Sequence, residues 1–241
     1  MAATSIIYRR ELGAFLRSPF AWVIASLVLL VDGIFFRGFV LPGEQLSAIV
    51  LERFFYYSSG VVMFAGILLS FRLIAEERTS HSMVLLNTSP VRDSQIIVGK
   101  FLAALTFLAI LLVLTLYMPL LIKVRGKITS SQIVVGYFGL LLLGSATLSV
   151  GLFASSMVKN QLLAAIIATV IIVVMVFLFQ FAKTLEGTVR DVLQELDLWW
   201  IHFQNGFMKG VLNLKDIIYY LAVTYFFLLL GVKTLEAKRW Q

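Results

Sequence analysis

The 241-residue sequence contains no cysteine, which excludes disulfides, thiolate metal sites and a cysteine nucleophile. It has only two histidines, His81 and His202, and they lie far apart, so we expect no metal centre. Charged residues make up only 14% of the chain, against about 25% in a typical soluble domain. Hydrophobic residues reach 60%, a share that excludes both an ordinary water-soluble domain and a disordered chain.

The motifs of nucleotide-binding and hydrolytic enzymes are also absent. Both glycine–lysine pairs, at 99–100 and 126–127, are followed by an apolar residue, so neither fits a phosphate-binding loop. Neither a metalloprotease helix motif nor a nucleophile elbow occurs. His202 could pair with a serine in a membrane hydrolase, but it lies in an aromatic segment without an organised partner. We therefore expect that the chain is not an enzyme and has no catalytic residue, cofactor or metal of its own.

Long uncharged runs are the strongest positive signal. Four of them have at least 18 residues: 54–71, 101–122, 128–158 and 160–182. A run of roughly that length crosses the hydrocarbon core as a helix, which satisfies its own backbone groups in lipid. Two weaker candidates, one of them interrupted by Asp32, complete the set. We predict an all-α polytopic membrane protein, a single transmembrane domain over residues 1–241 with six spans at 19–36, 54–71, 100–122, 133–157, 161–182 and 216–233.

Six spans place both termini on the same side of the membrane. Most cations outside the long segment 183–215 share that side, which the positive-inside rule assigns to the cytoplasm. The same-side segments hold Arg9, Arg10, Arg17, Arg72, Arg78, Arg92, Lys100, Lys159, Lys233, Lys238 and Arg239. The short opposite loops hold Arg37, Arg53, Lys123, Arg125 and Lys127. We assign the net charge of +7 to contacts with membrane lipid, not with nucleic acid.

Residues 1–18 show the pattern of an amphipathic basic helix. Apolar residues recur at helical spacing while the arginines lie mostly on other faces, as in a helix that lies flat among lipid headgroups. The alternative is a positive flank that only orients the first span. The residues concerned are Tyr8, Arg9, Arg10, Leu12, Phe15, Leu16 and Arg17.

Two further segments lie between the spans. Residues 72–99 form a polar loop that fits two short helices broken at Ser89-Pro90; it either docks into a soluble partner or is a solvated connector. Residues 183–215 contain apolar residues at helical spacing, followed by Trp199 and Trp200, which are typical of a membrane interface. We expect a half-inserted helical element there, or alternatively a surface helix packed on the spans.

Two features within the spans need an explanation. Asp32 is an intramembrane carboxylate, which is often functional; we favour the plainer interpretation of an ion pair with Arg37. Small residues at four-residue spacing predict close helix packing. These pairs are Ser145/Ser149, Gly151/Ser155 and Ala164/Ala168.

The order of the short motifs resembles the permeases of type 2 ABC exporters. The segments that carry the resemblance are Tyr8 to Leu12 (YRREL), Ile74 to Arg78 (IAEER), Leu85 to Val91 (LLNTSPV), Ile97 to Phe101 (IVGKF) and the chain from Gly210 to Trp240. The last of these is similar to the gliding-motility-type (GldF-like) branch and to nitrous-oxide-reductase accessory permeases. His81-Ser82-Met83 departs from the stretch that is commoner in the family.

The resemblance implies an architecture and a set of partners. It implies an interfacial connecting helix, six spans, a cytoplasmic coupling helix in 72–99 and extracytoplasmic re-entrant helices between the fifth and sixth spans. It also implies a second permease subunit and a separately encoded ABC ATPase that binds ATP and Mg²⁺. The residues expected to contact that ATPase are Glu76, Glu77, Arg78, Thr79, Ser80, Met83, Leu86, Ser89 and Pro90.

Function follows from the same resemblance. The expected role is that of a permease subunit in ATP-driven export across the bacterial inner membrane. The alternative is a non-transporting transducer that passes force to periplasmic or gliding-motility machinery, with a periplasmic accessory protein as a further partner. The sequence does not identify a cargo.

Overall fold

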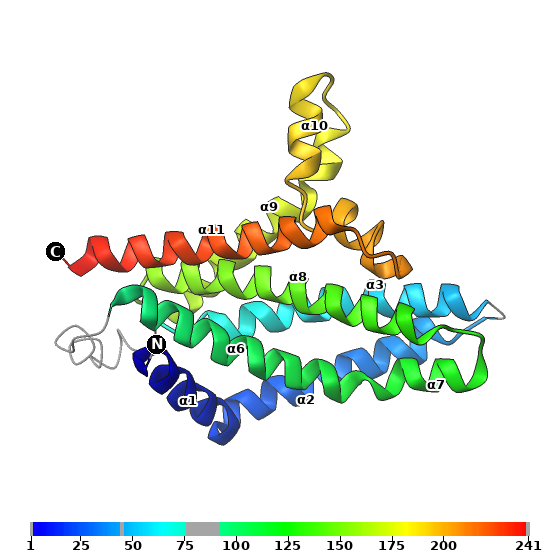
Figure 1. The fold of residues 1–241 in the computed structure, drawn as a ribbon, viewed down its shortest axis with the longest axis horizontal. Helices are drawn as coiled ribbons and strands as arrows, with labels where there is room; N and C mark the ends of the chain where they lie inside the picture. The colour runs from blue at the N-terminus through cyan, green and yellow to red at the C-terminus, as the bar shows by residue number, and fades with distance from the viewer. Residues whose placement is uncertain (1, 44–45, 76–91, 240–241) are drawn as a thin grey trace.

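The computed structural model describes residues 2–43, 46–75 and 92–239 of the chain. Within these ranges the regular elements are all helices (Figure 1). Six helical segments are long and apolar enough to cross a membrane, which confirms the predicted all-α class with six candidate spans. They run over Pro19–Val40, Ser47–Ser70, Asp93–Val124, Ser130–Met157, Gln161–Ala182 and Leu214–Lys238.

The helices follow one another with short connections. The elements are α1 (Ala2–Arg17), α2 (Pro19–Phe35), the π-turn η1 (Phe36–Val40), α3 (Ser47–Ser70), α6 (Asp93–Thr115), α7 (Tyr117–Arg125), α8 (Ser130–Met157), α9 (Gln161–Ala182), α10 (Thr188–Glu195), the π-turn η2 (Trp200–Gln204), the 3₁₀ turn η3 (Phe207–Lys209) and α11 (Leu214–Arg239).

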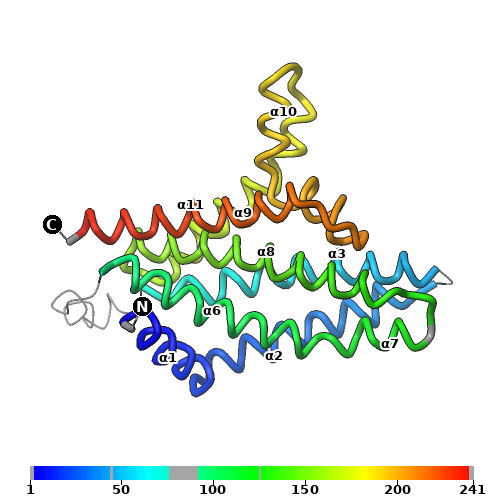
Figure 2. The backbone as a smooth tube through the Cα atoms, in the orientation of Figure 1, coloured from blue at the N-terminus to red at the C-terminus, as the bar shows by residue number. Residues whose placement is uncertain are grey.

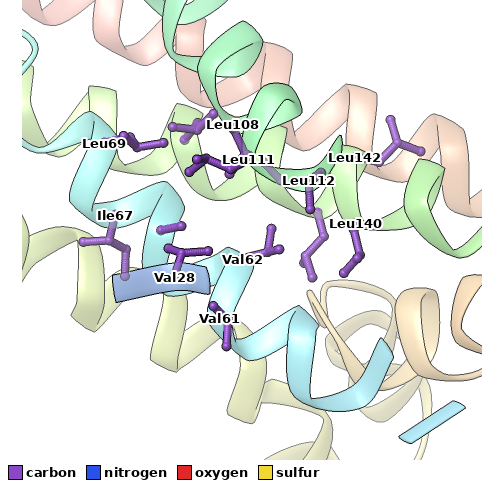
Figure 3. Close-up of a cluster of buried hydrophobic side chains, with 14 of the residues drawn as sticks. Val28, Val61, Val62, Ile67, Leu69, Leu108, Leu111, Leu112, Leu140 and Leu142 are labelled. Atoms are coloured by element: carbon purple, nitrogen blue, oxygen red, sulfur yellow. The ribbon is translucent and has the colours of Figure 1, made fainter. Parts of the chain in front are cut away.

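Helix α8 is the centre of the bundle, and it packs against α3, α6, α9 and α11 (Figure 2). Its small residues allow close approach: an added Cβ at Gly151 would lie 2.9 Å from the Cβ of Ser70 on α3. All six residues of the predicted small-residue pairs are buried. Leucine and valine side chains from α2, α3, α6 and α8 fill the space between these helices (Figure 3).

The bundle has two distinct ends. The start of α1, the end of α11 and the start of α6 lie at one end, called here the terminal end (Figure 1). Helix α7 lies at the opposite end, called here the far end. Helices α6 and α7 together cover 93–125, about 50 Å at 1.5 Å per residue, whereas the hydrocarbon core is about 30 Å thick. The bundle is therefore longer than a bilayer core is thick.

The segment 183–215 differs from a simple re-entrant hairpin. Helix α10 has no buried residue and projects sideways from the bundle (Figures 1 and 2). The following turns η2 and η3 return to the bundle, where Phe203 and Phe207 are fully buried. Only the second half of the segment therefore packs against the spans.

Candidate functional site

Helix α1 packs along α6, so its apolar stripe contacts protein. The hydroxyl of Tyr8 lies 3.2 Å from that of Thr106, and the ring of Phe15 stacks on Phe107 with centroids 5.4 Å apart. Leu12 packs against the same core. Of the predicted interfacial set, Leu16 is exposed together with the arginines Arg9, Arg10 and Arg17. Helix α1 therefore has one face packed against α6 and a basic outer face.

A buried ion pair fastens α1 to the first turns of α6. The ammonium of Lys100, only 2% exposed, lies 3.2 Å from a carboxylate oxygen of Glu11, which is 14% exposed. Arg10 contacts the same oxygen at 2.6 Å. Burial raises the pKa of Glu11, but the charges of Lys100 and Arg10 and their hydrogen bonds outweigh it, so the pKa is lowered overall. Glu11 is thus ionised at neutral pH.

The last turn of α8 holds two other chain segments at the terminal end. The hydroxyl of Ser155 accepts hydrogen bonds from the backbone N–H groups of Ile74, at 3.1 Å, and Ala75, at 3.0 Å. The ammonium of Lys238, near the end of α11, donates to the carbonyls of Ser156 and Met157. Helix C-termini leave such carbonyls without intrahelical partners.

We refer to these contacts together as the terminal rim, which comprises Glu11, Ile74, Ala75, Lys100, Ser155 and Lys238. It fixes the chain at Ile74 and Ala75, immediately before residue 76, and at Lys100 on α6. The predicted ATPase contacts themselves lie outside the described residues: Glu76, Glu77, Arg78, Thr79, Ser80, Met83, Leu86, Ser89 and Pro90. The rim was not predicted, because pairing of Glu11 with Lys100 depends on which helix α1 packs against.

A second polar cluster lies where α10, η2 and α11 meet. The Nδ1 of His202 is 2.8 Å from a carboxylate oxygen of Asp216, and its Nε2 is 3.1 Å from the carbonyl of Glu195. Asn213 donates to the other carboxylate oxygen at 3.0 Å. The His202 ring stacks on Tyr219 with centroids 3.7 Å apart. His202 therefore has a carboxylate and a carbonyl as partners instead of a serine, and the cluster ties 195–202 to the start of α11.

Asp197 and Trp199 hold the same segment against α3. One oxygen of Asp197 accepts from the N–H groups of Trp199, at 2.9 Å, and Ile201, at 3.1 Å. The other oxygen is buried without a partner among the described residues. Burial raises the pKa of this carboxyl, and the hydrogen bonds from Ile201, Trp199 and Trp200 only partly offset it.

The predicted interfacial role of Trp199 is corrected by its burial. Trp199 is only 7% exposed, and its indole N–H donates to the hydroxyl of Ser59 at 2.8 Å. It is a packing residue between η2 and α3. Trp200 is half-buried and stacks on Phe179 of α9.

Asp32 also departs from the sequence interpretation. It is 4% exposed and accepts a hydrogen bond from the hydroxyl of Ser58 at 3.0 Å, whereas Arg37 is exposed and has no ion pair with it. The difference arises because Asp32 faces the interior between α2 and α3, while Arg37 follows in the π-turn η1. Asp32 thus joins two helices.

Comparison with known families decides the class of the protein. A family model described as ABC-2 family transporter protein matches residues 5–232, which is nearly the whole described chain. The chain belongs to the ABC-2 transporter family. This ABC-2 protein is accordingly a multi-pass membrane protein and a membrane component of an ABC transporter. No curated protein matches it.

The described part of this ABC-2 chain offers no metal centre. Among residues 2–43, 46–75 and 92–239, no three histidine or carboxylate side chains are grouped as metal ligands. Of the features above, the terminal rim joins α1 to α6, and joins α8 both to the chain that follows α3 and to α11.

Proposed function

We propose that this ABC-2 chain is the permease subunit of an exporter in the bacterial inner membrane, with both termini in the cytoplasm. It pairs with a second permease, identical or paralogous, and each permease rests on a separate ATPase subunit that binds ATP and Mg²⁺. The observation that carries the proposal is the family match over residues 5–232. The sequence has no phosphate-binding loop of its own, which agrees with a separate ATPase.

The ATPase contact in this proposal is the segment 76–91. Glu76, Glu77 and Arg78 supply polar contacts, and Met83 with Leu86 supplies apolar ones. The terminal rim supports this assignment, because it anchors the chain on both sides of the segment. The segment can transmit force to the spans only if the chain on each side of it is fixed to them.

Movement of the ATPase subunits then reaches several spans together. A push on 76–91 acts on α3 and α8 through Ser155, and on α6 and α1 through the ion pair of Lys100 with Glu11. Packed helices switch between discrete arrangements instead of deforming continuously. Closure on ATP binding would thereby be converted into alternating access across the membrane.

Helix α9 is the surface that we assign to the second permease. Only 17% of its most apolar window is buried, as is also the case for α11, against 72% for α8. Lipid alone can cover such a face. The assignment therefore also rests on the pairing of two permease subunits that the family resemblance implies. The exposed apolar side chains are Leu162, Leu163, Ile166, Val170, Val173, Val174, Phe177 and Phe181.

Charge reversal at the segment tests the proposal. We expect the double variant Glu77→Lys/Arg78→Glu to lose co-purification of the partner ABC ATPase, and ATP-driven transport with it. Lys127→Glu at the far end is the matched control and should retain both. Full ATPase association and transport in the double variant would refute the contact.

The gliding-motility resemblance supports a second candidate, a transducer that drives periplasmic or motility machinery without moving a cargo. Reconstitution with the ATPase distinguishes the two. Transport of any cargo into vesicles supports the exporter. ATP hydrolysis that depends on the permease, together with specific capture of a periplasmic accessory protein and no transport, supports the transducer.

A further inference from the structure

A groove runs along the outside of the bundle between α2, α3 and α9. Its volume is about 460 Å³. Its walls are almost entirely apolar, and Gly60 of α3 forms part of its floor, with no atom within 4 Å of where a Cβ would be. Lining residues include Leu27, Val31, Phe35, Gly60, Met63 and Val176.

The position of the groove determines what surrounds it. Residues 27–35 and 56–64 lie within the candidate spans Pro19–Val40 and Ser47–Ser70, not at their ends. Leu27 and Phe64 on its walls are 41% and 49% exposed. An opening at this depth faces the hydrocarbon of the bilayer, which contains no water to fill it.

The far-end side of the groove is aromatic and then charged. Tyr57 lies 5.2 Å from Phe35, and Tyr56 lies 5.1 Å from Trp199, between ring centroids. Arg53 stands one turn further along the same face of α3, is half-buried and has no carboxylate partner among the described residues. Tyrosine rings favour the level of the headgroups, and arginine favours phosphate.

The size of the groove suits a narrow occupant. A helix about 10–12 Å wide is too broad to enter it whole and could only lay side chains across its opening. The volume lies within the range of about 300–1,000 Å³ that holds small molecules. A flexible alkyl chain, the main component of the surrounding medium, fits the lining, the depth and the volume together.

We propose that this groove binds one acyl chain of a phospholipid from the surrounding bilayer, with the phosphate of that lipid beside Arg53. The lipid would fill the space between α2, α3 and α9 on the outside of the bundle. The proposal rests on the groove alone and is independent of the ATPase contact and of any cargo.

Photolabelling in vesicles tests this directly. The whole chain is reconstituted in phosphatidylethanolamine and phosphatidylglycerol vesicles that contain a phosphatidylglycerol with a diazirine in mid-chain. Labelled sites are then mapped by mass spectrometry. We expect labelling to concentrate on 27–35 and 56–64, above the level on the exposed apolar side chains of α11, such as Ile218, Leu221 and Phe226.

Gly60→Leu places a side chain in the groove, at a position where an added Cβ meets no neighbouring atom within 4 Å, and should lower this labelling about fivefold or more, as loss of a specific site predicts. Gly33→Leu is the matched control: it adds the same side chain to α2, also into open space but outside the groove lining. It should label like the natural chain.

A second measurement guards against altered folding. Adding phosphatidylglycerol to detergent-purified protein should raise the thermal midpoint of the natural chain and of Gly33→Leu, but not of Gly60→Leu, because only a bound ligand stabilises by mass action.

Three results would overturn the proposal: even labelling over all lipid-facing residues, no effect of Gly60→Leu, or a disulfide between copies through a single introduced cysteine, Phe64→Cys, with no groove labelling. The last result would identify the groove as a protein interface. The chain has no cysteine of its own to confuse that assay.

Discussion

Two buried carboxylates outside the spans respond to their surroundings in opposite directions. Glu11 faces Lys100 and Arg10, so its charged form is favoured and its pKa is lowered. Asp197 has backbone N–H donors but no cation bonded to it, so burial prevails and its pKa is raised. The two groups therefore contribute to stability in opposite pH ranges.

Glu11→Gln should destabilise the fold by about 1.5–3 kcal/mol at pH 7, the range for a hydrogen bond to a charged group. A lowered pKa means that the ion pair stabilises above the usual value of 4.5 and that this contribution is lost as pH falls below it. The difference in unfolding free energy between Glu11→Gln and the natural chain should therefore become smaller at acidic pH. Thermal unfolding in detergent measures it, with the exposed Arg9→Gln as control; a gap constant with pH would contradict the ion pair.

At Asp197 the neutral side chain should be preferred. Because its pKa is raised, Asp197→Asn should be as stable as the natural chain or more so at pH 8, and any gain should shrink as pH falls toward 3.8. Asp197→Ala should cost about 1–3 kcal/mol, since the N–H groups of Trp199 and Ile201 lose their acceptor. Unfolding midpoints of the two variants decide this, and equal losses in both would refute it.

At the scale of the helices, close contact between α3 and α8 requires glycine, which has no side chain, at position 151. A Cβ at Gly151 would lie 1.9 Å from the hydroxyl oxygen of Ser70, too close for real atoms. Gly151→Ala should therefore lower the yield and thermal midpoint of folded protein, and adding Ser70→Gly should restore them. Gly33→Ala, which meets nothing within 4 Å, is the control. If Gly33→Ala is as harmful as Gly151→Ala, the packing argument fails.

The helices could be predicted from sequence where uncharged runs reach bilayer length. The fifth span, 161–182, coincides with α9. The second was predicted from 54, but α3 begins at Ser47, because Glu52 and Arg53 end an uncharged run without ending a helix. The third begins at Asp93 instead of 100, and the sixth begins at Leu214, for the same reason.

What sequence could not supply is the choice of partner for each helix face. The apolar stripe of residues 1–18 predicts a helix, yet lipid and α6 satisfy the stripe equally well. Tyr8 and Phe15 lie against α6, and this places Glu11 beside Lys100. Asp32 and Trp199 were misassigned for a related reason: each has a partner, Ser58 or Ser59, on α3.

At the scale of the whole molecule, the distribution of cations predicts which end of the bundle faces the cytoplasm. With the terminal end in the cytoplasm, a single cysteine at Lys127→Cys should react in intact cells with a maleimide that crosses the outer but not the inner membrane. Lys159→Cys should react only after the inner membrane is broken. Both side chains are exposed, so access depends on the side of the membrane alone. The reverse pattern would invert the topology.

The combined length of α6 and α7 has a practical consequence. About 50 Å of helix exceeds about 30 Å of hydrocarbon, so part of this pair of helices lies beyond the hydrocarbon core, and α7, which packs against α3, lies at the end opposite the termini. In the proposed orientation, an antibody fragment raised against this end would recognise the folded protein on the periplasmic side, at the opposite end from the proposed ATPase contact.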